Sequence, residues 1–330
     1  MSLLIKGEIK EDWFDKVSEN GEYVRKDSQF RNWITPDGEP GISGIGGFAA
    51  EKDRYHLYVS YACPWAHRTL IFRKLKKLED IISISVVHPF MDNNGWDFKD
   101  DYPAATGDML YSLNRMYEIY TKAQPDYSGI VTVPVLWDKK QETIVNNESS
   151  EIIRILNNAF NHLIDDEEAR ELDFYPEDKQ SEIDKINSLI YNNINNGVYR
   201  TGFATTQKSY EKAYTQLFDA LDKVEDILSE KRYLTGTEIT ESDWRLFVTL
   251  IRFDPVYVGH FKCNKKRIFD YPSLYNFMLE LYQWPGIADT TFMDHIKHHY
   301  YYSHDMINPT RIVPLGPEQN LMQKHNRDKI

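Results

Sequence analysis

The hydrophobic pattern of the N-terminal half predicts short strands that alternate with helices. Residues 55–60 (YHLYVS) are a short strand candidate, and residues 81–87 (IISISVV) alternate and are β-branched, which predicts a second strand. The stretch between them, which begins at residue 64, has helical spacing. Residues 131–138 and 142–145 predict a hairpin, and a helix follows it. This order of strand, helix, strand, insertion, hairpin and helix is that of a thioredoxin-like unit.

The C-terminal half shows helical spacing throughout. One apolar stripe steps by three and four residues, which predicts a long helix with one buried face. A second helix is predicted to begin at Thr240, because Thr240 and Asp243 have the spacing of an approximate capping box. The residues of the apolar stripe are Tyr210, Tyr214, Leu217, Leu221, Val224 and Leu228.

These patterns predict a fold of class α/β plus all-α, with a thioredoxin-like domain followed by an all-helical domain. A Pro/Gly-rich loop ends the first part of the chain, and an acidic run without core periodicity separates the two halves. We therefore expect an N-terminal extension (1–47), a thioredoxin-like domain (48–160), a linker (161–178), a helical domain (179–315) and a polar tail (316–330).

Composition excludes several classes of partner. The net charge of −12 argues against nucleic acid, and the densest basic run, residues 73–78, is interpreted as a solvated helix face. No apolar run approaches the roughly 20 residues that span a membrane, and the charged N-terminus does not resemble a secretory signal. With only two cysteines, Cys63 and Cys263, we expect neither a disulfide framework nor a metal site. A cytoplasmic, reducing compartment is the simplest interpretation.

Cys63 stands between a predicted strand and a predicted helix. Pro64 is favoured at the first helical position, which makes Cys63 the N-cap, where the free N–H groups and the helix dipole favour the thiolate. The alternative is a buried structural cysteine, and that is the role we expect for Cys263. Ala66 occupies the position of a resolving cysteine in dithiol oxidoreductases. An external thiol must therefore resolve any mixed disulfide that Cys63 forms.

Two further segments suggest a peptide-binding site. Pro134 lies in a predicted strand, either as an edge-strand proline or as a cis proline that leaves the backbone of Val133 open to a ligand. Glu148 and Ser149 begin the next helix, where they either cap it or bind the ammonium and carboxylate groups of a ligand. Together with Cys63, these features predict a site for a thiol peptide with both charges at one end, such as glutathione.

Three histidines near the C-terminus also raise the question of a metal site. His298, His299 and His304 are close in sequence, but no carboxylate or cysteine spacing accompanies them. We expect them on the surface or as helix caps.

Several blocks of the sequence resemble the glutathionyl-hydroquinone reductases, the Xi class of glutathione transferases. The similarity runs from about residue 30 to residue 316. It implies the two-domain fold above, a homodimer, and the glutathione-dependent reduction of glutathionyl-hydroquinones to hydroquinones with release of glutathione disulfide. The blocks are YVSYACPWAHRTL, TVPVLWD, NNESSEIIR, NNGVYRTGFA, RFDPVYVGHFKC and HHYYYSHDMINPT.

The resemblance also implies roles for individual residues that hold glutathione. Trp96 would pack on it, Val133 would pair with its cysteinyl backbone, and Glu148 with Ser149 would hold its γ-glutamyl end. Many members of the class carry a basic residue where this chain has Ile130. Another cation, such as one in residues 25–31, would have to replace it, or glutathione would bind less tightly.

The resemblance further implies that Tyr199 and Tyr300 bind or protonate the aromatic part of the substrate after Cys63 attacks the glutathione sulfur. Among 22 tyrosines, the sequence alone would place both in the core.

Two other functions remain open at this stage. An omega-like thioltransferase or dehydroascorbate reductase would use the same cysteine on small disulfides. A non-catalytic scaffold is the second alternative, although such proteins usually lose the nucleophile. A conventional conjugating transferase is disfavoured, because it needs a Ser or Tyr to stabilise the glutathione thiolate.

Overall fold

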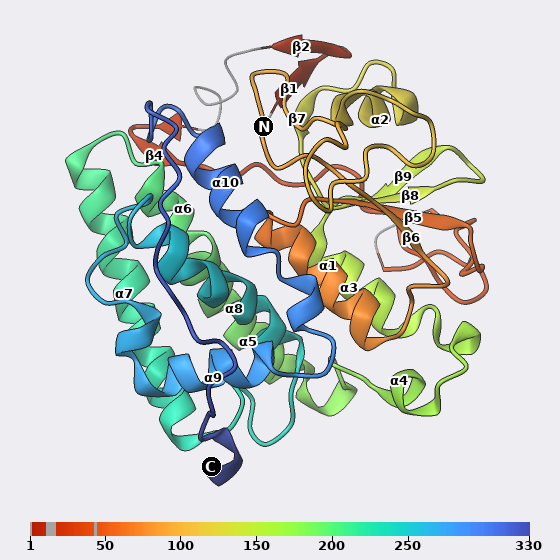
Figure 1. Ribbon diagram of the computed structural model, residues 1–330. Coiled ribbons are helices and arrows are strands. Elements are labelled where there is room, and N and C mark those ends of the chain that lie inside the picture. The colour runs from red at the N-terminus through yellow and green to blue at the C-terminus, as the bar shows by residue number, and fades with distance from the viewer. Residues whose placement is uncertain (1, 11–17, 43–44) are drawn as a thin grey trace. The chain divides into compact units, whose positions relative to one another are not determined.

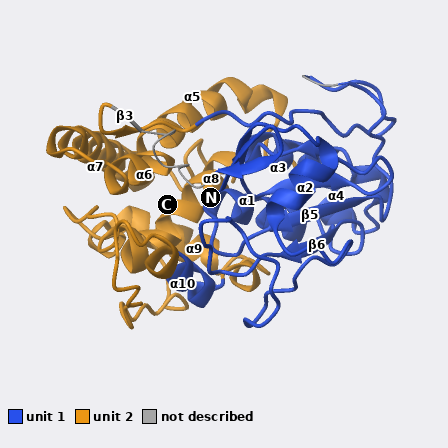
Figure 2. Ribbon diagram, turned by 90° about the horizontal axis from the view of Figure 1, so that it is seen from above, with its two compact units in different colours: residues 1–16, 26–172, 292–299 blue, residues 17–25, 173–291, 300–330 orange. Residues whose placement is uncertain are grey.

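The computed structural model describes residues 2–10, 18–42 and 45–330 (Figure 1). The chain forms two compact units, which Figure 2 shows in separate colours. Helix α10 (Met293–Ser303) is divided between the units: its residues up to His299 belong to unit 1, and those from Tyr300 on belong to unit 2. Unit 1 is Met1–Lys16, Lys26–Leu172 and Phe292–His299, and unit 2 is Val17–Arg25, Asp173–Thr291 and Tyr300–Ile330.

Unit 1 is built on a four-stranded sheet with the order β6-β5-β8-β9. Strand β5 is parallel to β6 and antiparallel to β8, and β8 is antiparallel to β9. Helices α1 and α3 cover one face of this sheet and α2 covers the other (Figure 1). The predicted thioredoxin-like arrangement is thereby confirmed. The elements are β5 (Tyr55–Val59), α1 (Pro64–Leu75), β6 (Ser83–Val86), α2 (Met116–Ala123), β8 (Val135–Asp138), β9 (Thr143–Asn146) and α3 (Ser149–Asn158).

The sequence pattern of the two central strands, β5 and β8, shows no polar face. Every residue of β5 and of β8 is buried, because helices cover both faces of the sheet. Polar side chains in this layer are internally bonded: the ring nitrogens of His56 contact Ser83 Oγ at 2.7 Å and Ser85 Oγ at 2.8 Å. Burial lowers the pKa of His56 to about 3, so the ring is neutral in the fold.

A second, smaller sheet joins the N-terminus to the strand before the hairpin. Its order is β2-β1-β7, and Leu3 of β1 lies opposite Ile130 of β7. The predicted strand 131–138 is wrong in its extent, since β7 ends at Val131 and the hairpin strand β8 begins at Val135. The elements are β1 (Ser2–Ile5), β2 (Glu8–Lys10) and β7 (Gly129–Val131).

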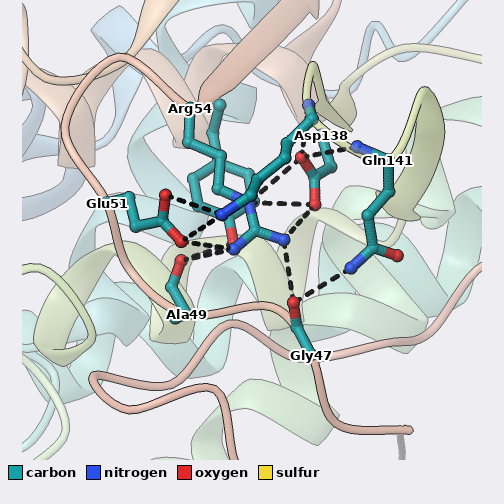
Figure 3. A network of polar contacts seen from close by, with 8 residues as sticks. Gly47, Ala49, Glu51, Arg54, Asp138 and Gln141 are labelled. Carbon is teal, nitrogen blue, oxygen red and sulfur yellow. Dashed lines mark hydrogen bonds and ion pairs between the residues drawn. The ribbon is translucent and has the colours of Figure 1, made fainter.

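Arg54 ties the Gly-rich loop to the main sheet (Figure 3). Its guanidinium binds the Asp138 carboxylate of β8, with Nη2 2.5 Å from Oδ2 and Nε 3.1 Å from both oxygens. The same group donates to the carbonyl oxygens of Gly47 and Ala49 and to Glu51 Oε1. Because Asp138 is fully buried, this bidentate pair neutralises a charge inside the fold.

The acidic segment 161–178 contains local structure that its composition did not predict. Helix α4 (Glu167–Glu171) begins at the N-cap Asp166, whose side chain accepts from the Ala169 N–H at 2.8 Å. The Lys76 ammonium of the preceding unit-1 helix region is fully buried and donates to the carbonyl oxygens of Arg170 and Leu172. The interpretation of residues 73–78 as a solvated face is therefore wrong at Lys76.

Unit 2 consists of helices with one short hairpin, β3 (Ser18–Glu19) and β4 (Glu22–Tyr23). The long helix predicted from the apolar stripe is α7, and the capping box of Thr240 and Asp243 begins α8 as predicted. None of the described helices is long and apolar enough to cross a membrane. The helices are α5 (Gln180–Ile190), η3 (Tyr191–Asn195), α6 (Gly197–Gly202), α7 (Gln207–Glu230), α8 (Glu241–Arg252), η4 (Phe253–Tyr257) and α9 (Pro272–Tyr282).

The C-terminal segment is attached to this unit by a buried arginine. Arg327 donates from Nη1 to the Leu228 carbonyl at 2.7 Å and from Nη2 to the Lys231 and Arg232 carbonyls at 2.5 Å. Its side chain therefore satisfies carbonyl groups at the C-terminus of α7. The domain boundaries expected from the sequence stay predictions.

Candidate active site

Cys63 is the N-cap of α1, as predicted. Its backbone is extended, with φ −76° and ψ 121°, and Pro64 occupies the first turn of the helix. The Cys63 carbonyl accepts the His67 N–H at 2.9 Å, which is the first hydrogen bond of α1. The residue is 8% exposed, so the thiol lies just inside the surface of unit 1. The helix N–H groups and dipole in this position favour a thiolate.

The segment around Pro134 lies against this thiol. The Val133–Pro134 peptide bond is cis, which confirms one of the two explanations offered for this proline. Cys63 Sγ lies 3.4 Å from the carbonyl oxygen of Val133. One residue earlier, the Tyr120 hydroxyl donates to the Thr132 carbonyl at 2.9 Å. Val133 is thus held between the cysteine and the hairpin strand.

Tyr120 also connects this segment to the start of α3. Its hydroxyl accepts from Asn147 Nδ2 at 3.1 Å, and Asn147 immediately precedes Glu148. Tyr120 is fully buried, and its hydroxyl links the two segments predicted to bind a peptide through hydrogen bonds to both. The sequence singled out neither Tyr120 nor Asn147.

Glu148 and Ser149 begin α3 as expected. Glu148 is the N-cap, and its Oε1 accepts from the Ser150 N–H at 3.0 Å and from Ser150 Oγ at 2.8 Å. Ser28 Oγ donates to Glu148 Oε2 at 3.2 Å. Glu148 therefore caps the helix, and because its partners here are neutral donors, the carboxylate keeps its negative charge. A bound ammonium group would add to these contacts.

Arg68 brings a positive charge to the same helix start. It lies on α1, five residues after Cys63, and its Nη1 is 3.4 Å from Ser149 Oγ. The guanidinium also lies 4.6 Å from the ring centroid of Trp65, and Arg68 is fully buried. A buried arginine beside the N-terminus of α3 favours an anion there. Arg68 was not predicted from the sequence, although its position on the helix after CPWA was a usable signal.

Trp96, which the resemblance places against glutathione, packs against a histidine in unit 1. It is 4% exposed, and its ring stacks on His299 at a centroid distance of 4.6 Å and an interplanar angle of 21°. His299 is held in turn by a 2.9 Å contact from Nδ1 to the Pro89 carbonyl. The backbone carbonyl of Trp96 accepts the Met116 N–H at 3.1 Å.

A surface position, one of the two alternatives expected for the three histidines, is wrong for two of them. His299 and His304 are 6% and 5% exposed, because both rings pack among other aromatic side chains. His298 is part-exposed and bonds to the Tyr102 hydroxyl. Within the part of the chain that the structure describes, no group of three His, Cys, Asp or Glu side chains is arranged to hold a metal ion.

Tyr199 and Tyr300 lie together in unit 2. Their hydroxyl oxygens are 2.5 Å apart, and the hydroxyl of Tyr257 lies 3.0 Å from that of Tyr300. Tyr300 is 1% exposed and Tyr257 is fully buried, whereas Tyr199 is half-buried. Burial raises the pKa of Tyr300 well above its ordinary value, so this hydroxyl stays protonated. Tyr257 was not singled out from the sequence, since nothing local separates it from the other tyrosines.

The structure also places Ile130, Arg31 and Cys263. Ile130 lies in β7 opposite Leu3, and Arg31 forms a bidentate pair with Glu151, with Nε 2.7 Å from Oε2. Cys263 is fully buried, and burial raises the pKa of its thiol, which agrees with a structural role. Both cysteines are free thiols.

Two domain families match the sequence. The family "Glutathione S-transferase, N-terminal domain" matches residues 62–159, which contain Cys63, Val133 and Glu148. The family "Glutathione S-transferase, C-terminal domain" matches residues 207–280 in unit 2. These matches confirm the predicted fold class.

Characterised relatives extend over nearly the whole chain. Glutathionyl-hydroquinone reductase YqjG of Escherichia coli is 56% identical over 99% of this chain and 99% of its own. Glutathionyl-hydroquinone reductase PcpF of Sphingobium chlorophenolicum is 49% identical over 97% of this chain and 98% of its own.

Solved structures give the same picture. The glutathione-bound structure of YqjG from Escherichia coli K-12 is 54% identical, covers 99% of each chain and superimposes with a TM-score of 0.91. The glutathione transferase Xi from Phanerochaete chrysosporium is 52% identical, covers 94% of this chain and 97% of its own, and has a TM-score of 0.88.

Proposed function

The chain belongs to the glutathione S-transferase family, within its Xi-class glutathionyl-hydroquinone reductases, and we propose that it reduces glutathionyl-hydroquinones to hydroquinones with glutathione as co-substrate. The observation that carries this proposal is the Cys63 thiol at the N-terminus of α1, 3.4 Å from the Val133 carbonyl, in a chain 56% identical to such a reductase. That arrangement supports a thiolate nucleophile beside a backbone able to align a peptide.

The reaction proceeds in two displacements. The Cys63 thiolate attacks the glutathionyl sulfur of the substrate, and an S–S bond forms as the bond from that sulfur to the ring carbon breaks. The electron pair stays on the ring carbon, which takes a proton from a tyrosine hydroxyl and leaves as the hydroquinone. Cys63 and the glutathionyl sulfur are thereby oxidised to a disulfide while the ring is reduced.

A second glutathione completes the cycle. Its thiolate attacks the glutathionyl sulfur of the mixed disulfide, which releases glutathione disulfide and restores the Cys63 thiolate. The proton that this glutathione loses replaces the one taken from the tyrosine. Ala66 stands where a dithiol enzyme has its second cysteine, so the external thiol is obligatory.

Glutathione is held by residues of unit 1 in this proposal. Val133 pairs with its cysteinyl backbone, next to Pro134, and Trp96 packs on it. Glu148 binds the γ-glutamyl ammonium, and Ser149 with the N-terminus of α3 binds the carboxylate. The Arg68 contact at Ser149 supports an anion in that place.

Tyr199 and Tyr300 are assigned to the aromatic part of the substrate. Their assignment rests on chemistry, because the leaving ring carbon needs a proton and their hydroxyls form a bonded pair. We also propose a homodimer, which sedimentation of the purified protein tests. A cytoplasmic location is consistent with two free thiols.

One alternative activity uses the same cysteine. An omega-like thioltransferase would reduce glutathione mixed disulfides, which needs Cys63 and glutathione but no protonation of carbon. The two activities are separable by substrate, because only the thioether requires a tyrosine proton.

The test is turnover of a glutathionyl-hydroquinone in the presence of glutathione, followed as free hydroquinone and glutathione disulfide. We expect turnover by the parent and by Cys263→Ala, which removes the buried thiol, and none by Cys63→Ala. A parent that reduces only glutathionylated 2-mercaptoethanol would favour the thioltransferase instead. A parent silent on both substrates would favour a scaffold.

A further inference from the structure

Three tyrosine hydroxyls in unit 2 form a single hydrogen-bonded chain. The hydroxyl of Tyr257 lies 3.0 Å from that of Tyr300, and the hydroxyl of Tyr300 lies 2.5 Å from that of Tyr199. The first two residues are buried and the third is half-buried. The chain therefore runs outward from the core to Tyr199.

The two ends of this chain are set by irregular helical turns. Tyr257 is the last residue of the π-helical turn η4, in which the Val258 N–H donates to the Phe253 carbonyl at 2.9 Å. Tyr199 follows the π-helical turn η3, in which the Asn196 N–H donates to the Tyr191 carbonyl at 2.9 Å. Such turns are rare and are often found at functional sites, because they re-aim side chains within a helix.

The middle of the chain is held from the same turn. Tyr301, the neighbour of Tyr300 on α10, donates its hydroxyl to the Pro255 carbonyl of η4 at 3.3 Å. Consecutive residues of α10 thus bond to η4 through a backbone carbonyl and through the Tyr257 hydroxyl. The position of the Tyr300 hydroxyl follows from both contacts.

Aromatic rings surround the three tyrosine hydroxyls, so it matters which hydroxyl donates each hydrogen bond. The ring of Tyr257 stacks on Phe261 at 5.4 Å, and the ring of Tyr199 lies 5.5 Å from Phe261 and 6.1 Å from Phe203. A hydroxyl among aromatic rings is costly unless it is bonded. Each phenol has one hydrogen, so Tyr199 can point its own hydrogen away from the chain only when it accepts from Tyr300. While it donates to Tyr199, the Tyr300 hydroxyl can also accept a hydrogen bond from Tyr257.

We propose that Tyr257 is a positioning residue for the proposed reaction: its hydroxyl orients Tyr300 as the donor to Tyr199, so that Tyr199 presents its own proton to the leaving ring carbon. When Tyr199 gives up that proton, its phenolate accepts the hydrogen bond from Tyr300, and the chain of two donors stabilises the charge. The proton released by glutathione in the second displacement restores Tyr199. This inference rests on the proposed function.

The protonation state of Tyr300 agrees with its role as the hydrogen-bond donor to Tyr199. Burial raises its pKa well above the ordinary value, so it acts as a donor and does not ionise in place of Tyr199. The positive charge of Arg252 has the opposite effect and lowers the pKa of Tyr300, but burial dominates.

The test compares two substrates in the variant Tyr257→Phe. This change removes one hydroxyl and keeps the ring. We expect kcat for a glutathionyl-hydroquinone to fall roughly tenfold at unchanged KM, which corresponds to the loss of one hydrogen bond. Reduction of glutathionylated 2-mercaptoethanol should be unchanged, because its leaving group is a thiolate and needs no proton on carbon.

Tyr301→Phe is the matched control, since it removes the neighbouring hydroxyl that also bonds to η4. It should leave the ratio of the two activities unchanged. The double variant Tyr199→Phe/Tyr257→Phe should be no slower than Tyr199→Phe alone, because Tyr257 acts only through that end of the chain.

A proportional loss of both activities in Tyr257→Phe would show a purely structural role and overturn the inference, as would no loss at all. Additive losses in the double variant would also overturn it. A parent without thioether turnover would remove the proposed function itself, and with it this inference. A parent that turns over normally while Tyr257→Phe shows no selective loss would remove the inference alone.

Discussion

The Sγ atom of Cys63 lies 3.4 Å from the carbonyl oxygen of Val133, and the two residues come from the start of α1 and from the cis peptide before β8. This contact joins the two segments that the sequence marked independently, one by a cysteine before a proline and one by a proline within a strand-like run. It defines where a glutathionyl sulfur must lie to be attacked.

The carboxylate of Glu148 is predicted to bind glutathione in addition to capping α3. Glu148→Gln keeps an oxygen that accepts the Ser150 N–H, but it removes the negative charge. We expect KM for glutathione to rise about tenfold while the melting temperature changes little. Steady-state kinetics and thermal unfolding measure the two effects.

Asp166→Asn is the control for that change, because Asp166 caps α4 in the same way. It should leave KM for glutathione unaltered. An unchanged KM in Glu148→Gln would mean that Glu148 serves only as a cap.

Arg54 is predicted to be the main stabiliser of the loop at Gly47 (Figure 3). Arg54→Met would leave the fully buried Asp138 carboxylate without its counter-charge. We expect the free energy of unfolding to fall by about 3 kcal/mol, as for other broken buried pairs. Denaturation by urea measures this change.

Arg267→Met provides the comparison, since Arg267 and Asp270 form an exposed pair three residues apart. That variant should lose less than about 1 kcal/mol. Equal losses in the two variants would contradict the buried role of Arg54.

Arg327 is predicted to anchor the C-terminal segment. Its guanidinium donates to three carbonyl groups at the end of α7, and Arg327→Met would leave them without these donors. We expect a loss of about 3 kcal/mol in the free energy of unfolding. The exposed neighbour Lys329→Met should have no measurable effect, and the same loss in both variants would refute the anchor.

His56 is predicted to make the fold sensitive to acid. Its pKa is lowered to about 3 in the folded protein from an ordinary value of 6.5, so below 6.5 the unfolded chain binds a proton that the folded chain refuses. Stability is therefore complete above that pH and falls as the pH drops toward 3, by up to about 1.4 kcal/mol per pH unit.

His56→Gln should flatten this slope, as measured by urea denaturation at a series of pH values. The same change at the exposed His162 should leave the slope as it is in the parent. A parent-like slope in His56→Gln would show that other groups cause the acid sensitivity.

Local signals in the sequence were sufficient for the start of α1 in unit 1 and for helices α7 and α8 in unit 2. Pro64 at the start of a helix, Thr240 with Asp243 at the start of another, and the apolar stripe of α7 each depend on neighbours within a few residues. The fold class followed from their order. Patterns of this range are what periodicity and capping rules detect.

The features that escaped prediction depend on partners distant in sequence. Lys76 donates hydrogen bonds to carbonyls at the end of α4, and Arg327 donates to carbonyls at the end of α7, so both can be buried. The Tyr257 hydroxyl contacts that of Tyr300, a residue distant in the sequence. Composition marks such residues as solvated or apolar, since the group that satisfies them is nowhere near in the chain.

The central claim is that Cys63 alone takes glutathione from the substrate. The most direct measurement is a single turnover without free glutathione, in which the protein is mixed with excess glutathionyl-hydroquinone and analysed by peptide mass spectrometry. The account predicts one hydroquinone released per chain and one glutathionyl group in disulfide linkage on Cys63, removed afterwards by added glutathione. Release of hydroquinone without this adduct, or an adduct on Cys263 instead, would contradict it.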